Sequence, residues 1–238
     1  MRIWDVQPGY LNRQSLLGEH RELHAMVSII VNGKKGYARH PETLRWRGYG
    51  WALRHRHRML AEEMALRGYR DKSPVRLRSG AGLWPETFLD PPDQQFQILA
   101  EKYRTRFGGR IPLPQTTQQL WRHHKYSILA RDPEAYREIG QKTARCPKRE
   151  DFEALAGQLV EVCRRPPTTG GIRNTLLHMW GHVSGHYCSR GSTPVADWPL
   201  RRLLEETRRL ACRHNEPYLT AATRSEEHTS ELQSPSAI

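Results

Sequence analysis

The chain has 238 residues, enough for two domains of ordinary size, and carries 38 Lys and Arg against 25 Asp and Glu. Its net charge of +13 and pI of about 10.0 indicate an anionic partner, because phosphate neutralisation supplies most of the non-specific affinity for nucleic acid. No apolar run approaches the roughly 18 residues that span a bilayer, and the start of the chain lacks the apolar core of a signal peptide. The composition therefore excludes a membrane-spanning protein and predicts a cytoplasmic one.

Residues 12–33 predict an amphipathic helix of about five turns. Asn12 is a good N-cap and Gly33 a good helix stop. Apolar positions recur at helical spacing between them, with one histidine included: Leu16, Leu17, His20, Leu23, Val27, Ile30 and Val31. At about 100° per residue, Glu22 falls away from this stripe, near the small residues Ser15 and Gly18. The small side chains leave room for a ligand to approach the carboxylate, although a lone Glu on a helix is most often an ordinary solvated group.

Residues 34–47 are basic, aromatic and broken by glycine, which predicts a loop. A positive loop that contains Tyr37 and Trp46 could hold a phosphate backbone and fill a gap in a base stack. The alternative is an ordinary solvated connection.

Two further helices are predicted in the N-terminal half. The first covers residues 51–67 and stops at Gly68, and its segment 54–58 places five potentially cationic side chains on consecutive positions, so only some of them can face one partner. Four prolines in residues 73–92 predict an ordered loop. The second helix begins at residues 90–92, buries Phe96, Leu99 and Tyr103, and ends at residues 108–109. Residues 1–110 hold 20 Lys and Arg against 11 Asp and Glu, so most of the positive excess lies here.

A linker is predicted at residues 111–116, where prolines interrupt helix formation. Helical patterns then occupy residues 120–130, 134–145, 151–164 and 172–186, followed by one from 197–199 to about 213. The predicted fold class is all-α: a three-helix domain with long loops at residues 1–110, and a small helical domain at residues 117–223.

Three histidines, His178, His182 and His186, recur every four residues in the fourth of these helical patterns. An i, i+4 pair can chelate a metal, but an H-E-x-x-H motif is absent and a third histidine at this spacing drifts around the helix. The pattern therefore favours a polar face that packs against residues 121–124 or binds an anion. The four cysteines form no C-x-x-C pair, which predicts reduced thiols: Cys146, Cys163, Cys188 and Cys212.

Residues 224–238 resemble a translated sequencing adapter. They turn from basic to acidic and show no periodic apolar pattern. We expect this tail to be artefactual and disordered, with the natural domain truncated near Thr223.

Several short motifs in the first hundred residues are informative together. They are Arg2-Ile3, Arg21-Glu22-Leu23, Asn32-Gly33-Lys34 and Leu66-Arg67-Gly68-Tyr69. With them, residues 1–106 resemble the pyrimidine-dimer DNA glycosylase (endonuclease V) family, and Glu101-Lys102 falls where that family has a Glu-Lys pair on its third helix. Residues 115–223 resemble an uncharacterised bacterial helical domain that is fused to other nucleic-acid-related domains.

The resemblance implies an endonuclease-V-like first domain: a DNA repair glycosylase with AP-lyase activity on pyrimidine dimers in double-stranded DNA. The catalytic groups it implies are the α-amine of Met1, as nucleophile, and the carboxylate of Glu22. Met1 stands where the phage enzyme exposes a threonine, and the bulky residue that follows it should prevent removal of the methionine. DNA contacts are expected from five basic residues: Arg2, Arg21, Lys34, Lys35 and Lys102. No metal, cofactor, membrane or obligatory protein partner is implied.

Three departures from the family pattern keep other functions open. Ala25 stands in place of a basic residue, Ser15 in place of a histidine, and the family's aromatic C-terminal tail is missing. The alternatives are a non-catalytic nucleic-acid-binding adaptor, and a glycosylase that acts on another base lesion.

Overall fold

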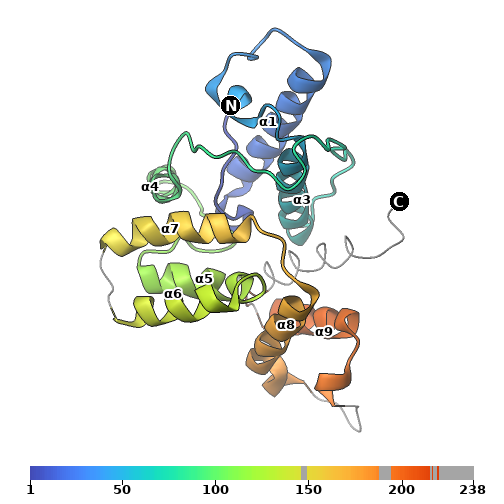
Figure 1. Ribbon diagram of the computed structural model, residues 1–238, viewed down its shortest axis with the longest axis vertical. Coiled ribbons are helices and arrows are strands. Elements are labelled where there is room, and N and C mark those ends of the chain that lie inside the picture. Colours follow the sequence, from blue (N-terminus) through green and yellow to red (C-terminus); the bar gives the residue numbers. More distant parts are fainter. Residues whose placement is uncertain (146–148, 188–193, 215, 217–218, 220–238) are drawn as a thin grey trace. The chain divides into compact units, whose positions relative to one another are not determined.

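The computed structural model describes residues 1–145, 149–187, 194–214, 216 and 219 (Figure 1). These residues form helices joined by turns and coil, and no strand occurs among them, so the predicted all-α class is confirmed. The chain divides into two compact units, Met1–Leu113 and Pro114–Ile238. Within the described part, no helix is both long enough and apolar enough to cross a membrane. The predictions for Cys146, Cys188 and the tail at 224–238 lie outside the described residues.

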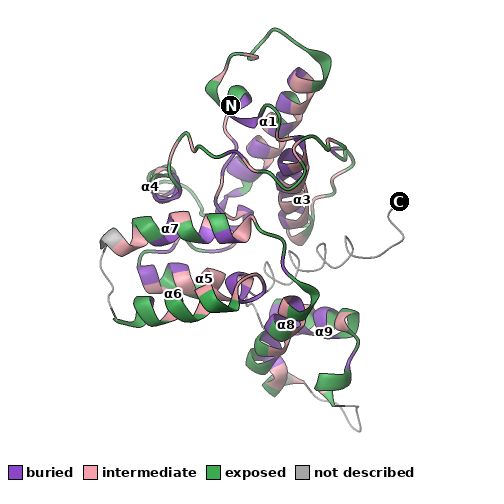
Figure 2. Ribbon diagram, viewed as in Figure 1, coloured by how far each residue is buried: buried purple, intermediate pink, exposed green. Residues whose placement is uncertain are grey.

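The first unit contains a 3-10 turn and four α-helices: η1 (Pro8–Tyr10), α1 (Arg13–Asn32), α2 (Pro41–Trp46), α3 (Gly50–Leu66) and α4 (Pro92–Lys102). Helices α1 and α3 pack against each other. The core draws apolar side chains from the three long helices: Leu16, Leu23 and Met26 from α1, Leu53 and Leu60 from α3, and Phe96 and Leu99 from α4. The buried parts of the ribbon are purple in Figure 2.

Helix α1 has the ends that the sequence predicts. The Asn12 side chain accepts a hydrogen bond from the Ser15 backbone N–H, and Gly33 closes the helix in the left-handed region at φ 60°. The buried face differs from the predicted stripe, since it includes Glu19, while Val31 at the far end is exposed. A carboxylate can occupy this buried position because an arginine from α3 pairs with it.

Two predictions for the first unit were wrong: the loop at residues 34–47 and the end of the helix that begins at residues 90–92. The segment 34–47 contains the short helix α2, which begins at Pro41 and is capped by the His40 side chain. Helix α4 ends at Lys102 rather than near residue 108. It stops there because the Tyr103 hydroxyl is anchored between the Asn12 N–H and the Tyr10 carbonyl, and the following chain turns back towards η1.

The second unit is also helical. Its elements are α5 (Thr117–Leu129), α6 (Pro133–Arg145), α7 (Arg149–Cys163), α8 (Thr169–Val183), η2 (Ser184–His186), η3 (Val195–Asp197) and α9 (Leu200–Arg213). Helix α5 contacts α6, α7 and α8, and α8 contacts α9. The core around α8 and α9 includes Trp180 and Trp198, whose ring centroids lie 5.1 Å apart. The five helices predicted for this half are therefore present, with ends that shift by a few residues.

The histidines of α8 face outwards. His178 and His182 are exposed, and the ring of His182 meets the edge of Tyr126 on α5 at 5.7 Å. This contact agrees with the predicted packing against α5, while the side chain of His186 is outside the described residues. Cys163 and Cys212 form no disulfide.

Candidate active site

The first residues of the chain run extended across α1, held by carboxylates of that helix. The backbone N–H of Arg2 donates to Glu22 Oε2 at 2.5 Å, and the N–H of Trp4 donates to Glu19 Oε1 at 3.1 Å. Glu19 and Glu22 stand three residues apart and therefore share one side of the helix. Alternate N–H groups of the extended chain are thus bound to neighbouring positions of α1.

The intervening residues are bound to other helices. The N–H of Ile3 donates to the Glu42 carboxylate on α2, and the N–H of Asp5 donates to Gln95 Oε1 on α4 at 2.8 Å. Side-chain acceptors from three helices therefore bind four consecutive backbone N–H groups. In a β-sheet, the carbonyl groups of a neighbouring strand would bind such donors. The start of the chain has a defined position although it belongs to no regular element.

This anchoring places the terminal amine close to Glu22. The Met1 side chain accepts a hydrogen bond from the Thr43 hydroxyl at 3.6 Å, so the residue is held on the side of α2 as well. One peptide unit separates the amine from the Arg2 nitrogen, a span of less than about 4 Å. With the Arg2 hydrogen bond, the amine nitrogen lies no more than about 6 Å from Glu22 Oε2.

A pocket of about 710 Å³ opens beside Glu22. Its walls come from the extended start of the chain, from α1 and from α4, and they include Arg2, Trp4, Ser15, Gly18, Glu22, Gln97, Glu101 and Lys102. The predicted relation between Glu22 and the small residues of α1 is therefore present. A Cβ added at Gly18 would meet nothing within 4 Å, so this wall is open.

Three of the predicted site residues, Arg2, Glu22 and Lys102, line this pocket. The other three basic residues do not. Arg21 is exposed and turns back along the helix, where its Nε donates to the Leu17 carbonyl at 3.3 Å. Lys34 and Lys35 are exposed beyond the end of α1, which lies ten residues, or about 15 Å of helix, past Glu22. Their role as DNA contacts stays a prediction.

The Arg2 side chain is held in place by two groups that the sequence did not single out. Its Nη1 lies 2.5 Å from Asp90 Oδ2, and its guanidinium lies 4.8 Å from the centre of the Trp4 ring. Asp90 lies 88 residues after Arg2 in the sequence, so no local sequence pattern predicts the pair. The contact leaves 40% of the Arg2 side chain exposed and offsets part of its charge.

Beneath the pocket, Glu19 and Arg56 form a buried ion pair. Arg56 Nε and Nη2 donate to the two Glu19 oxygens at 2.7 and 2.9 Å, and Nη1 donates to the Val6 carbonyl at 2.8 Å. Burial raises the pKa of Glu19 above its ordinary value, and the Arg56 guanidinium opposes that rise. The pair ties α3 to α1 through the same Glu19 carboxylate that accepts the Trp4 N–H. Glu19 could have been found from its position three residues before Glu22.

One aromatic residue proposed for a base stack is unavailable for that role. Trp46 is 1% exposed, and its indole N–H donates to Glu42 Oε1 at 2.8 Å. Tyr37, by contrast, is 69% exposed and takes a positive φ of 55°. Only Tyr37 of these two can meet an extended surface such as DNA.

Two known families match the chain, one within each of its two compact units. Residues 1–77 match the family model described as pyrimidine dimer DNA glycosylase, and residues 125–192 match a family described as protein of unknown function (DUF1722). Searches of curated proteins and of solved structures found no match. The Glu101-Lys102 pair lies beyond the first match, yet both residues line the pocket. Residues 1–77 are therefore similar to a family of DNA glycosylases that act on pyrimidine dimers, and residues 125–192 are similar to a family without an assigned function.

Proposed function

We propose that the first unit is a DNA glycosylase with AP-lyase activity, which acts on pyrimidine dimers through an imine on the Met1 amine. The observation that carries this proposal is the hydrogen bond from the Arg2 N–H to Glu22, because it brings the start of the chain to the carboxylate at the pocket. An α-amine titrates near about 8, well below a lysine near about 10.4, so terminal amines can act as nucleophiles at neutral pH.

The amine nitrogen would bond to C1′ of the damaged nucleotide while the C1′–N bond to the base breaks, and the base leaves with the electron pair and takes up a proton. A proton then passes from nitrogen to O4′ as the C1′–O4′ bond breaks, which gives a ring-opened hydroxyl and a protonated imine. Removal of a C2′ proton expels the 3′ phosphate and cuts the strand, and water hydrolyses the imine to restore the amine.

Glu22 has two tasks in this sequence. Its negative charge stabilises the positive charge that develops on the sugar, and the carboxylate then accepts and returns protons during ring opening and elimination. Arg2 and Lys102, which both line the pocket, would bind the flanking phosphates. A dimer is already poorly stacked, so the distortion that brings its sugar to the amine costs less there than in intact duplex.

Borohydride trapping on a duplex with one abasic site tests the proposal. The wild-type chain should form a covalent adduct, and a variant with a two-residue N-terminal extension should form none while it still binds the duplex. Glu86→Gln, which removes an exposed carboxylate outside the pocket, is the matched control for charge and should trap like wild type. No wild-type adduct under conditions of measurable DNA binding would refute the imine mechanism.

The second candidate is a non-catalytic nucleic-acid-binding adaptor. It is favoured by Ala25, which is exposed on α1 where the family has a basic residue, and by Asp90, which offsets the charge of Arg2. DNA binding without any adduct supports this reading. A third, a glycosylase for another lesion, predicts an adduct with abasic DNA but base release from a different damaged duplex in a panel.

A further inference from the structure

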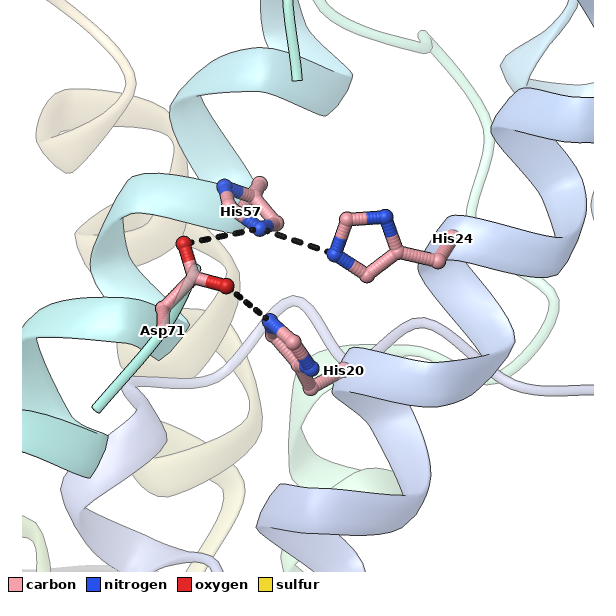
Figure 3. Close-up of side chains that lie close together, drawn as sticks. All are labelled: His20, His24, His57 and Asp71. Carbon is pink, nitrogen blue, oxygen red and sulfur yellow. Dashed lines mark hydrogen bonds and ion pairs between the residues drawn. The ribbon is translucent and has the colours of Figure 1, made fainter. Parts of the chain in front are cut away.

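Three histidines and an aspartate converge on the side of α1 away from Glu22 (Figure 3). His20 and His24 stand one turn apart on α1, His57 comes from α3, and Asp71 follows the end of α3. One ligand atom from each residue lies within 4.8 Å of all the others. We propose that these four side chains bind one divalent transition-metal ion of the zinc class.

The spacing of the ligand atoms fits a tetrahedral ion. His24 and His57 approach through Nε2 at 3.1 Å, His20 Nε2 lies 3.3 Å from Asp71 Oδ1, and His57 Nε2 lies 3.6 Å from Asp71 Oδ2. Zn–N and Zn–O bonds of about 2.0–2.2 Å in a tetrahedron place neighbouring ligand atoms about 3.4 Å apart. The three separations lie on both sides of that value, so binding requires only the wider pairs to contract.

The imidazole rings are arranged around a common point. Their centroids form a nearly equilateral triangle with sides of 4.7, 4.8 and 5.1 Å. Three imidazoles that bind one tetrahedral ion through Nε2 would have centroids about 5 Å apart. The His24 ring stands at 74° to the His20 ring and at 80° to the His57 ring, while the His20 and His57 rings are tilted by 34°. Figure 3 shows the Nε2 atoms of His57 and His24 directed towards each other.

Hydrogen bonding among the four residues does not satisfy the cluster. The Nε2 atom of His20 is buried and makes no regular hydrogen bond, although it lies 3.3 Å from Asp71 Oδ1. The nitrogens of His24 and His57 face each other, so only one of them can carry the proton of that contact. A cation at the centre would accept a lone pair from each nitrogen and pair with the carboxylate at once.

The surroundings favour a structural site over a catalytic one. The side chains of His20, His57 and Asp71 are 14, 4 and 16% exposed. Asp71 Oδ1 also accepts the Ser73 backbone N–H at 3.1 Å, the kind of outer contact that orients a metal-binding carboxylate. Four protein ligands complete a tetrahedron and leave no position for substrate. Imidazole nitrogens with one carboxylate suit Zn²⁺ better than Mg²⁺ or Ca²⁺, which prefer oxygen ligands alone.

A bound ion would join three segments of the first unit: α1, α3 and the turn that follows α3. At about 100° per residue, Glu22 lies roughly 160° from both His20 and His24 around α1. The ion would therefore hold α1 on the face opposite Glu22 and would take no part in the imine chemistry. This inference stands whether or not the enzyme proposal is correct.

The test uses the purified full chain, stripped with a chelator and titrated with Zn²⁺ against a chromophoric competitor. Wild type should bind one ion with a Kd below about 1 µM, as structural zinc sites do. His20→Gln together with His24→Gln should weaken binding at least about 100-fold, since changes in the outer contacts alone cost about 10- to 100-fold. The matched control is the exposed pair on α8, with His178→Gln and His182→Gln, which should change the Kd by less than about twofold.

A second variant guards against misfolding. Asp71→Asn keeps the shape of the side chain and should still weaken binding at least about tenfold, with the helical circular dichroism of wild type. Substitution with Co²⁺ gives an independent reading on wild type, whose visible spectrum should be that of a four-coordinate ion. The proposal is overturned if the wild-type chain binds no Zn²⁺, if Co²⁺ binds with six-coordinate geometry, or if the α8 variant loses as much affinity as the α1 variant.

Discussion

Helix α1 presents two polar faces with opposite character. On one face, Glu22 borders an open pocket and receives the N–H of the residue next to the chain terminus. On the other, His20 and His24 are closed in by His57 and Asp71. An open carboxylate beside an amine suits a reaction on a large substrate, whereas converging nitrogens in a closed space suit an ion that stays bound. The lesson is that access, more than residue type, separates a site for chemistry from a site for structure.

Helix α3 supports both faces with adjacent residues. Arg56 reaches Glu19 beneath the pocket, and His57 completes the histidine cluster. These contacts pair residues 19 and 56 and residues 20 and 57, so one register between α1 and α3 positions both sites. A shift of either helix would disturb the two together, while a change of one side chain should affect only one.

The largest expected effect is on the open face. Glu22→Gln keeps an oxygen that can accept the Arg2 N–H but loses the charge, so the rate of borohydride trapping should fall about 10²- to 10⁴-fold. Zinc affinity, measured by competition on the same preparation, should stay within about twofold because the ligands are on the opposite face. Unchanged trapping would show that the carboxylate is not needed.

The next effect is on the support that both faces share. Glu19→Gln leaves Arg56 buried without its counter-charge, which should lower the free energy of unfolding by about 3–5 kcal/mol. Urea unfolding followed by circular dichroism measures the loss. The exposed Glu86→Gln should stay within about 0.5 kcal/mol of wild type. An equally small change for Glu19→Gln would mean that the pair does not link α1 to α3.

Removal of the proposed ion should have a moderate effect confined to stability. Zn²⁺ at 100 times its Kd should stabilise the fold by about 2.7 kcal/mol. For a unit of this size that corresponds to roughly 10 °C in Tm. Calorimetry with and without chelator measures the shift. Trapping at 20 °C, where the stripped protein is still folded, should change by less than about threefold; a larger loss would place the ion in the reaction.

The smallest effect should come from a single basic residue at the pocket. Lys102→Gln should weaken DNA binding and reduce the slope of log affinity against log salt by about 0.9, the value for one lost phosphate contact. Lys35→Gln, beyond the far end of α1, is the matched comparison, and filter binding at several salt concentrations measures both. An equal change for Lys35 would extend the DNA-binding surface along the whole helix.

Several elements could be read from local sequence. Asn12 and Gly33 predicted the ends of α1, because a side-chain cap and a left-handed glycine act within a few residues. Short-range rules failed for the end of α4, since Tyr103 is anchored by Asn12 and Tyr10 from the other end of the domain. They also failed for Trp46, whose burial depends on packing beyond its own loop.

The candidate sites divide in the same way. Family motifs selected Glu22, Arg2 and Lys102, which line one pocket, but gave no sign that Arg21 turns away from it. His20 and His24 show the i, i+4 spacing of a chelating pair. The sequence pattern nevertheless placed His20 in the apolar stripe of α1, and the metal-binding pattern was considered only for the histidines of α8. The missing information was that His57 and Asp71 lie beside them.

The amino-acid sequence by itself determined the all-α class, most of the helices, the positive charge and the similarity of the first segment to a glycosylase family, because these depend on composition, periodicity and short motifs. Tertiary structure decided which side chains share a space: the terminal residues with Glu22, Arg2 with Asp90, Glu19 with Arg56, and three histidines with Asp71. Each of these contacts joins residues at least 14 positions apart. The packing of the elements of the first unit against one another brings them together.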